Sequence, residues 1–115
     1  MILVANNEAG RMIGCVYLQQ YETQLYLGML TVSPEIQSRG IGKQLLRAAE
    51  NYAIQMSCTV ITMTVIDARA ELIEWYKRHG YHATGETIPF PSSPSFGIPK
   101  QALQFIVLEK QTGDI

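Results

Sequence analysis

The sequence has 115 residues, of which 47% are hydrophobic and 17% are charged, a length and composition typical of one folded domain over residues 1–115. Nine Lys and Arg against ten Asp and Glu give a net charge of −1, and there is no basic block, so nucleic acid is a poor candidate partner. No apolar run approaches the ~20 residues that span a bilayer, and the first ten residues lack a signal-peptide pattern, so we expect a cytoplasmic protein without a membrane partner.

The two cysteines, Cys15 and Cys58, have no Cys or His neighbour at metal-ligand spacing. This pattern predicts neither a metal site nor a disulfide framework. We expect both thiols to be buried as small hydrophobic side chains.

The first third of the chain has the pattern of a β-meander. Ile2–Ala5 is a short apolar run that ends at the turn formers Asn6–Gly10, and Met12–Gln20 and Gln24–Val32 are β-rich runs too short for helices. Gly28 interrupts the third of these strands, and glycine at such a position often marks a bulge or the close approach of a ligand.

After this meander the period changes to that of a helix. Apolar residues recur at three-to-four spacing over Ile41–Met56, and the β-branched run Val60–Ile66 then predicts a central strand. A strand, helix, strand crossover implies that Leu25–Val32 and Val60–Ile66 pair in parallel, so we predict an α/β fold with a mixed, mostly antiparallel sheet.

The rest of the chain predicts a second helix and two strands. Asp67 is the expected N-cap of a helix over Arg69–His79, which Gly80 ends in a left-handed conformation. The segments that follow are predicted as a strand (Tyr81–Thr87), a proline-rich loop (Pro89–Pro99), a strand (Leu103–Glu109) and a frayed tail (Lys110–Ile115).

A basic, glycine-containing segment lies where the third strand leads into the first helix; its residues are Gln37, Ser38, Arg39, Gly40, Ile41, Gly42 and Lys43. The first N–H groups of a helix have no intrahelical acceptor, and two cations lie beside them, so a phosphate group is the natural ligand. The alternative is structural, with Ser38 as a simple N-cap and the glycines as turn residues. The spacing is that of neither a P-loop nor a dinucleotide-binding fingerprint.

The stretch VSPEIQSRGIG at residues 32–42, followed by Leu45 and Leu46, resembles the acyl-CoA signature of the GNAT superfamily of N-acyltransferases. A second block, ELIEWYKRHGY at residues 71–81, resembles a later helix of the same family. The resemblance covers Met12–Tyr81 well and the last third of the chain loosely. It implies a GNAT-like domain that lacks the usual N-terminal strand and helices.

The resemblance implies that the protein binds acetyl-CoA and transfers its acetyl group to a primary amine of a small molecule or peptide. The main-chain amides of Gln37–Lys43 would then hold the pyrophosphate, and the main chain of Leu30 and Val32 would bind the pantetheine arm. An N–H group near Leu30 would stabilise the oxyanion. Tyr76 would protonate the leaving thiolate, although helix geometry alone favours a core aromatic at this position.

The catalytic base is where the sequence departs from the family. Tyr26 occupies the strand position that often carries a carboxylate, and Arg69 occupies a position where many relatives have an Asn that contacts CoA. Deprotonation would run through water or through one of the other candidates: Glu22, Asp67, Glu71, His82 and Glu86.

Two other functions are compatible with the sequence: a non-catalytic acyl-CoA binding or sensing domain, and a plain interaction domain. The short N-terminal part would leave the edge of Ile2–Ala5 unpaired and apolar sheet surface uncovered. We therefore expect a homo-oligomer, with a homodimer as the first choice, or a missing segment supplied from elsewhere.

Overall fold

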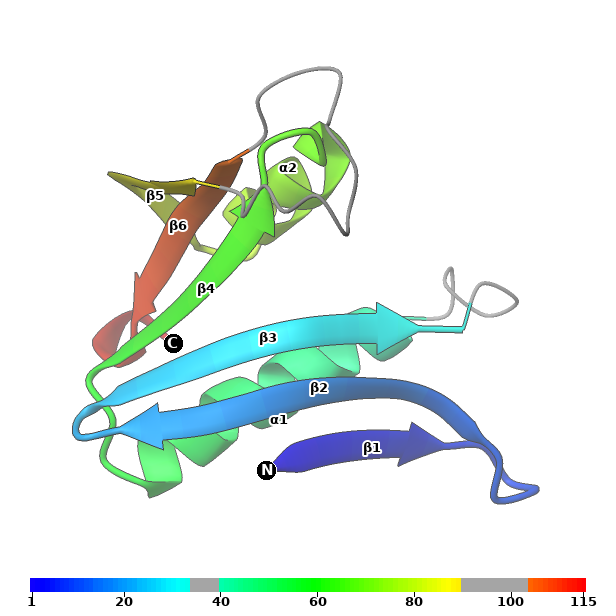
Figure 1. The fold of residues 1–115 in the computed structure, drawn as a ribbon. Coiled ribbons are helices and arrows are strands. Elements are labelled where there is room, and N and C mark those ends of the chain that lie inside the picture. The colour runs from blue at the N-terminus through cyan, green and yellow to red at the C-terminus, as the bar shows by residue number, and fades with distance from the viewer. Residues whose placement is uncertain (34–39, 90–103) are drawn as a thin grey trace. The chain divides into compact units, whose positions relative to one another are not determined.

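The computed structural model describes residues 1–33, 40–89 and 104–115 (Figure 1). These residues form two compact units. Unit 1 comprises residues 1–62 and 111–115, and unit 2 comprises residues 63–110. One strand, β4 (Val60–Ile66), begins in unit 1 and ends in unit 2.

Unit 1 contains an antiparallel meander of β1 (Ile2–Asn6), β2 (Met12–Tyr21) and β3 (Gln24–Val32). The start of β4 lies beside β3 and pairs with it in parallel, in the register Gln24–Val60, Leu25–Ile61 and Tyr26–Thr62. This parallel step follows from the crossover helix α1 (Ile41–Gln55), as the sequence predicts. The predicted fold class, a mixed and mostly antiparallel sheet with one parallel pair, is confirmed.

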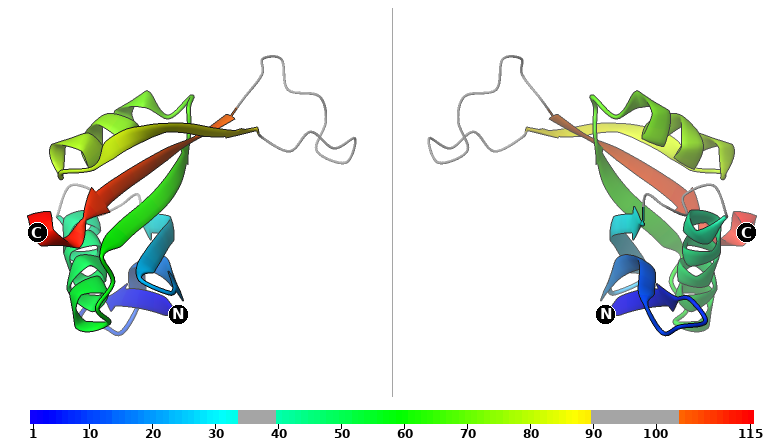
Figure 2. Two further views of the ribbon diagram at one scale, coloured as in Figure 1. Left: turned by 90° about the vertical axis from the view of Figure 1, so that its left-hand side faces the viewer. Right: turned by 90° about the vertical axis from the view of Figure 1, so that its right-hand side faces the viewer.

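Helix α1 covers one face of this meander (Figure 2). A Cβ atom on Gly14 of β2 would lie 3.0 Å from Leu45 and 3.2 Å from Ile41, so position 14 points at α1. Because strand side chains alternate, the same face carries the buried apolar residues of β2 and β3 that pack on the helix. The buried apolar residues of unit 1 are Val16, Leu18, Leu25, Leu27, Leu45, Leu46, Ala49, Ala53, Cys58 and Ile61.

The opposite face of β1–β3, here named the distal face, carries the other alternate residues. The register pairs Ile2 with Tyr17 and Val4 with Cys15, and it pairs Tyr17 in turn with Gly28. Ile2 is 60% exposed and Val4 is 49% exposed.

Unit 2 contains the rest of β4, α2 (Ala70–Arg78), β5 (His82–Pro89) and most of β6 (Gln104–Gln111), with β6 between β4 and β5. Strands β5 and β6 pair antiparallel. The buried apolar residues of this unit are Met63, Val65, Ile73, Tyr76, Tyr81, Val107 and Leu108.

The predicted frayed tail is wrong. Strand β6 continues to Gln111, and a 3₁₀ helix follows over Thr112–Asp114. The Thr112 N–H group donates to the Thr59 carbonyl at 3.0 Å, and its hydroxyl donates to the Cys58 carbonyl at 2.8 Å. These two bonds hold the tail residues in unit 1.

The predicted cap at Asp67 is also wrong, because Arg69 is the N-cap of α2 and makes no side-chain capping bond. The Asp67 N–H group instead donates to the Gln104 carbonyl at 2.9 Å, just beyond the end of β4. A turn closed by the Arg69 N–H group and the Ile66 carbonyl then leads into the helix. The predicted αL end is confirmed, with Gly80 at φ 95°.

Both cysteines are free thiols, but they differ in burial. Cys58 is buried as predicted, and burial raises the pKa of its thiol. Cys15 is only half-buried, because it lies on the distal face rather than under α1. The predicted loop after β5 falls at residues 90–99, outside the described residues, and β5 itself extends to Pro89.

Candidate functional site

The start of α1 is the first part of the candidate site. Its N-cap is Gly40, which has φ 76° and ψ 14° in the left-handed region and makes no side-chain capping bond. Gly40 therefore holds the position that the structural alternative gave to Ser38. Gln37, Ser38 and Arg39 lie outside the described residues.

The first turn of α1 presents N–H groups and a positive charge. The first intrahelical bond joins the Gln44 N–H group to the Gly40 carbonyl at 3.0 Å, so the N–H groups of Ile41, Gly42 and Lys43 precede the helical ladder. Lys43 is exposed, and the first turn contains no acidic residue. This end of the helix is suited to an anion.

Strand β3 contains the bulge that Gly28 predicts. The register with β2 jumps from Tyr17–Gly28 to Cys15–Thr31, so Met29 and Leu30 together lie opposite one residue of β2. Leu30 is half-buried and lies in this bulge, and Val32 ends the strand. Both lie further along β3 than Tyr26, the last residue in the ladder with β4.

Tyr26 and Gly28 form a contact that the sequence analysis did not foresee. A Cβ atom on Gly28 would lie 3.0 Å from Cε1 and 3.5 Å from the hydroxyl oxygen of Tyr26. The phenol ring therefore lies along the strand, over the glycine. The signal in the sequence is the spacing itself, since residues two apart on a strand share a face.

Tyr76 lies in α2, on the buried side of that helix, and its side chain is 4% exposed. Its ring packs edge-on against Trp75 at 5.1 Å and against Tyr81 at 5.9 Å between centroids. Burial raises the pKa of the Tyr76 phenol to about 12, and the positive charge of Arg69 opposes this shift. The phenol is thus fully protonated at neutral pH.

Two of the candidate bases lie beside side chains that can pair with them. Arg69 donates to the Glu71 carboxylate at 2.8 Å, and this hydrogen bond lowers the pKa of the exposed carboxyl group. The imidazole of His82 lies 3.5 Å from the carboxylate of Glu109. A lowered pKa makes Glu71 a weaker base than a free glutamate.

The other three candidate bases lie in different elements. Glu22 is exposed in the turn between β2 and β3, Asp67 is half-buried after β4, and Glu86 is exposed in β5. In the described ranges no group of three or more His, Cys, Asp or Glu side chains is arranged to hold a metal ion.

The model of the Acetyltransferase (GNAT) family matches residues 1–81. The chain belongs to this family. An acetyltransferase from Bacillus cereus is 28% identical, with a TM-score of 0.74, and the match covers 96% of this chain and 71% of that one. Together with the family match it supports acetyl-CoA-dependent N-acetyltransferase activity, and the non-catalytic alternative is not favoured.

Two further structures are similar in fold. Nourseothricin acetyltransferase is 20% identical with a TM-score of 0.81 and is covered over 64% of its length. A Bacillus anthracis protein, assigned as a streptothricin acetyltransferase and solved in complex with acetyl coenzyme A, is 18% identical with a TM-score of 0.79 and is covered over 61%. Each match covers 96% of this GNAT chain, which thus spans about two thirds of these structures.

No curated protein sequence matches this GNAT chain. Neither of the described α-helices is long and apolar enough to cross a membrane.

Proposed function

We propose that this GNAT domain transfers the acetyl group of acetyl-CoA to a primary amine of a small molecule or peptide. The observation that carries the proposal is the start of α1, where Gly40 adopts a left-handed conformation and the following N–H groups lead a helix with no acidic first turn. This end lies inside the segment matched by the family model. The similar Bacillus anthracis structure contains acetyl coenzyme A, which supports the same donor here.

The proposed binding residues for the pyrophosphate are Gln37, Ser38, Arg39, Gly40, Ile41, Gly42 and Lys43. The main-chain N–H groups would donate to phosphate oxygens, and Lys43 would add a full charge beside the helix dipole. Leu30 and Val32 would bind the pantetheine amides through their own main chain, as an added strand does. The bulge at Leu30 supports this role, because a bulge turns backbone groups out of the regular ladder.

In the proposed reaction the lone pair of a neutral amine attacks the thioester carbonyl carbon. A C–N bond forms, and an N–H group near Leu30 stabilises the oxyanion. The C–S bond then breaks, and the Tyr76 phenol donates its proton to the departing sulfur. The amide nitrogen loses its extra proton to water, and water returns a proton to the phenolate. The charge of Arg69, which lowers the pKa of Tyr76, would stabilise that phenolate.

The pyrophosphate site is tested by thermal shift with acetyl-CoA. Nothing lies within 4 Å of a Cβ atom built on Gly40, so a side chain there meets open space. Gly40→Asp should abolish the shift through its negative charge, and Gly40→Asn, which has the same shape and tolerates the left-handed region, should retain much of it. Equal shifts in wild type and both variants would contradict the proposal.

The role of Tyr76 is tested by Tyr76→Phe. Loss of the proton donor should lower kcat by about 10²- to 10⁴-fold with little change in acetyl-CoA affinity. Tyr52→Phe, in α1, is the matched control and should keep wild-type activity. If Tyr76→Phe were fully active, the thiolate would take its proton from water.

Three further expectations belong to this proposal: one domain over residues 1–115, a cytoplasmic location and a homodimer. The exposed apolar side chains of β1 support the dimer.

A further inference from the structure

The distal face contains a hydroxyl group at an unusual position. The Tyr26 ring lies over Gly28, which places its oxygen 3.5 Å from where a Cβ atom of residue 28 would be. The side chain thus reaches along β3 in the direction of the bulge at Leu30. Tyr17 is the cross-strand partner of Gly28, and its hydroxyl group donates to the side-chain oxygen of Gln19 at 3.2 Å.

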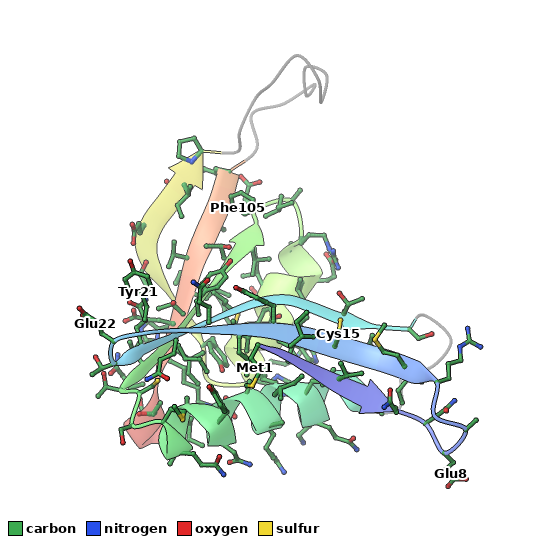
Figure 3. All side chains as sticks on the ribbon, turned by 60° about the horizontal axis from the view of Figure 1, so that its bottom comes forward. Met1, Glu8, Cys15, Tyr21, Glu22 and Phe105 are labelled. Carbon is green, nitrogen blue, oxygen red and sulfur yellow. The ribbon has the colours of Figure 1, made fainter. Side chains whose placement is uncertain are left out.

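Within the described part of the chain, β1, β2 and β3 place no charged side chain on this face. Strands β1 to β4 contain no Asp, Glu, Lys, Arg or His. Among the described residues, the carboxylates that flank β2 in the chain are Glu8 and Glu22, and Figure 3 shows them in the turns at its opposite ends. Around Tyr26 and Tyr17 the register places the amide of Gln19. The β3 surface beside Leu30 therefore offers hydroxyl, amide and aromatic groups.

An ammonium group that is desolvated against this surface finds no carboxylate among the described side chains of β1–β3 to compensate it. A neutral amine loses much less solvation free energy on the same surface. The pKa of an alkylamine such as a lysine side chain is ~10.4, so only roughly one molecule in a few thousand is neutral at pH 7. A weakly basic amine, with its nitrogen attached to an aromatic ring, is neutral at that pH. Its ring can also pack against the rings of tyrosine residues.

We propose that the acceptor is a weakly basic aromatic amine, which binds in its neutral form against Tyr26 and Gly28 on the distal face. This inference rests on the proposed acetyl transfer and on the proposed position of the thioester near Leu30. The amine donates one N–H group to the Tyr26 hydroxyl oxygen, which orients its lone pair toward the thioester carbonyl carbon. After attack, the positively charged nitrogen passes a proton to water.

The decisive experiment measures kcat/KM against pH for three acceptors that differ in basicity: an aromatic amine, the α-amino group of a dipeptide and an alkylamine. With no enzymatic base, the inflection should follow the pKa of each amine, and the aromatic amine should give a flat profile between pH 6 and pH 9 by this argument. An inflection at one pH for all three would reveal a base on the protein and overturn the inference. A preference for the alkylamine at pH 7 would also overturn it and would indicate an ammonium held by the tyrosine rings.

Variants test the position itself. Tyr26→Phe should raise KM for the aromatic amine by roughly 5- to 30-fold, the loss of one hydrogen bond, with acetyl-CoA affinity unchanged. Gly28→Ala should act in the same direction, because its methyl group would lie 3.0 Å from the Tyr26 ring and displace it. Unchanged KM in both variants would refute the role of Tyr26.

Two further measurements separate this inference from the proposed function. Tyr26→Glu introduces a carboxylate and should increase acetylation of the alkylamine, with an inflection that no longer follows the amine; no gain would count against the inference. Tyr52→Phe is the control for a lost phenol elsewhere in unit 1. If wild type acetylates none of the three amines, or does not bind acetyl-CoA, the proposed function itself fails.

Discussion

The ammonium group of Lys110 donates a hydrogen bond of 2.8 Å to the carbonyl oxygen of His79, the C-cap residue of α2. The same nitrogen lies 5.4 Å from the centroid of the Tyr81 ring. Gly80 makes this arrangement possible, since a Cβ atom there would lie 3.0 Å from Cε of Lys110. Lys110 therefore ties β6 to the end of the helix that carries Tyr76.

Gly80→Ala should destabilise the protein by about 1–3 kcal/mol. The φ of 95° costs an L-residue roughly 1–2 kcal/mol, and the added methyl group displaces the Lys110 side chain. Urea unfolding followed by circular dichroism measures the loss. Lys110→Met should cost about 1 kcal/mol through the lost bond to the helix end.

Lys77→Met is the control for this prediction. Lys77 is exposed in α2 and lies 4.0 Å from the carboxylate of Glu74, which is also exposed, so its removal should change the free energy of unfolding by less than about 0.5 kcal/mol. Equal losses for Lys77→Met and Lys110→Met would show that general charge, rather than the bond to His79, stabilises the helix end.

The raised pKa of Tyr76 predicts a specific loss of stability at alkaline pH. The unfolded phenol titrates near 10 and the folded phenol at about 12, so between these values only the folded state retains the proton. Unfolding then releases a proton, and the free energy of unfolding falls as pH rises from 10 to 12, by at most about 2–3 kcal/mol. Below pH 9 the free energies of unfolding of wild type and Tyr76→Phe should differ by a constant amount. Above pH 9 the free energy of unfolding of wild type should fall relative to that of Tyr76→Phe. Parallel curves up to pH 12 would contradict the buried phenol.

Much of the fold could be predicted from the sequence because the spacing at which apolar residues recur differs between strands and helices. The alternation in Gln24–Val32 gave the bounds of β3, and three-to-four spacing after Gly40 gave the start of α1. The bulge that follows Gly28 is one of the two features predicted there, since glycine in a strand interior often marks a bulge or the close approach of a ligand.

The errors and omissions have a different physical origin. The ends of elements depend on tertiary bonds, such as those of Thr112 to Cys58 and Thr59, which leave no local pattern. The contact of Lys110 with His79 joins residues far apart in the chain and is invisible to any local reading. The contact of Tyr26 with Gly28 is local, but it depends on a side-chain rotamer that composition does not specify.

Gly14→Ala should weaken both the fold and acetyl-CoA binding. Gly14 is buried, and a methyl group there would lie 3.0 Å from Leu45, 3.1 Å from the Thr31 carbonyl oxygen and 3.2 Å from Ile41. The side-chain ends can shift, but the Thr31 carbonyl belongs to the backbone of β3, so we expect a loss of about 1–3 kcal/mol. Ile41 starts α1, so the displaced helix end should also raise the Kd for acetyl-CoA. Calorimetry measures both.

Gly113→Ala is the matched control, because nothing lies within 4 Å of a Cβ atom on Gly113. Its stability and acetyl-CoA affinity should equal those of wild type. If Gly14→Ala lost stability but kept its affinity for acetyl-CoA, the packing of α1 on β2 would be unrelated to the proposed pyrophosphate site.

The last prediction concerns the edge of the sheet in unit 1. Among the described residues β1 pairs with β2 alone, and Ile2–Ala5 contains no charged residue or proline that would discourage pairing with another strand. Antiparallel pairing of β1 with its own copy would bury Ile2 and Val4 about a twofold axis.

Light scattering at micromolar concentration should give the mass of two chains. Val4→Lys should reduce it to one, since Val4 is 49% exposed and two lysines would meet near the axis. Leu3 is unsuitable because it pairs with Val16 and lies on the face covered by α1. Ile54→Lys, an equally exposed apolar position on α1, should leave the dimer intact; a wild-type mass of one chain would refute the edge interface.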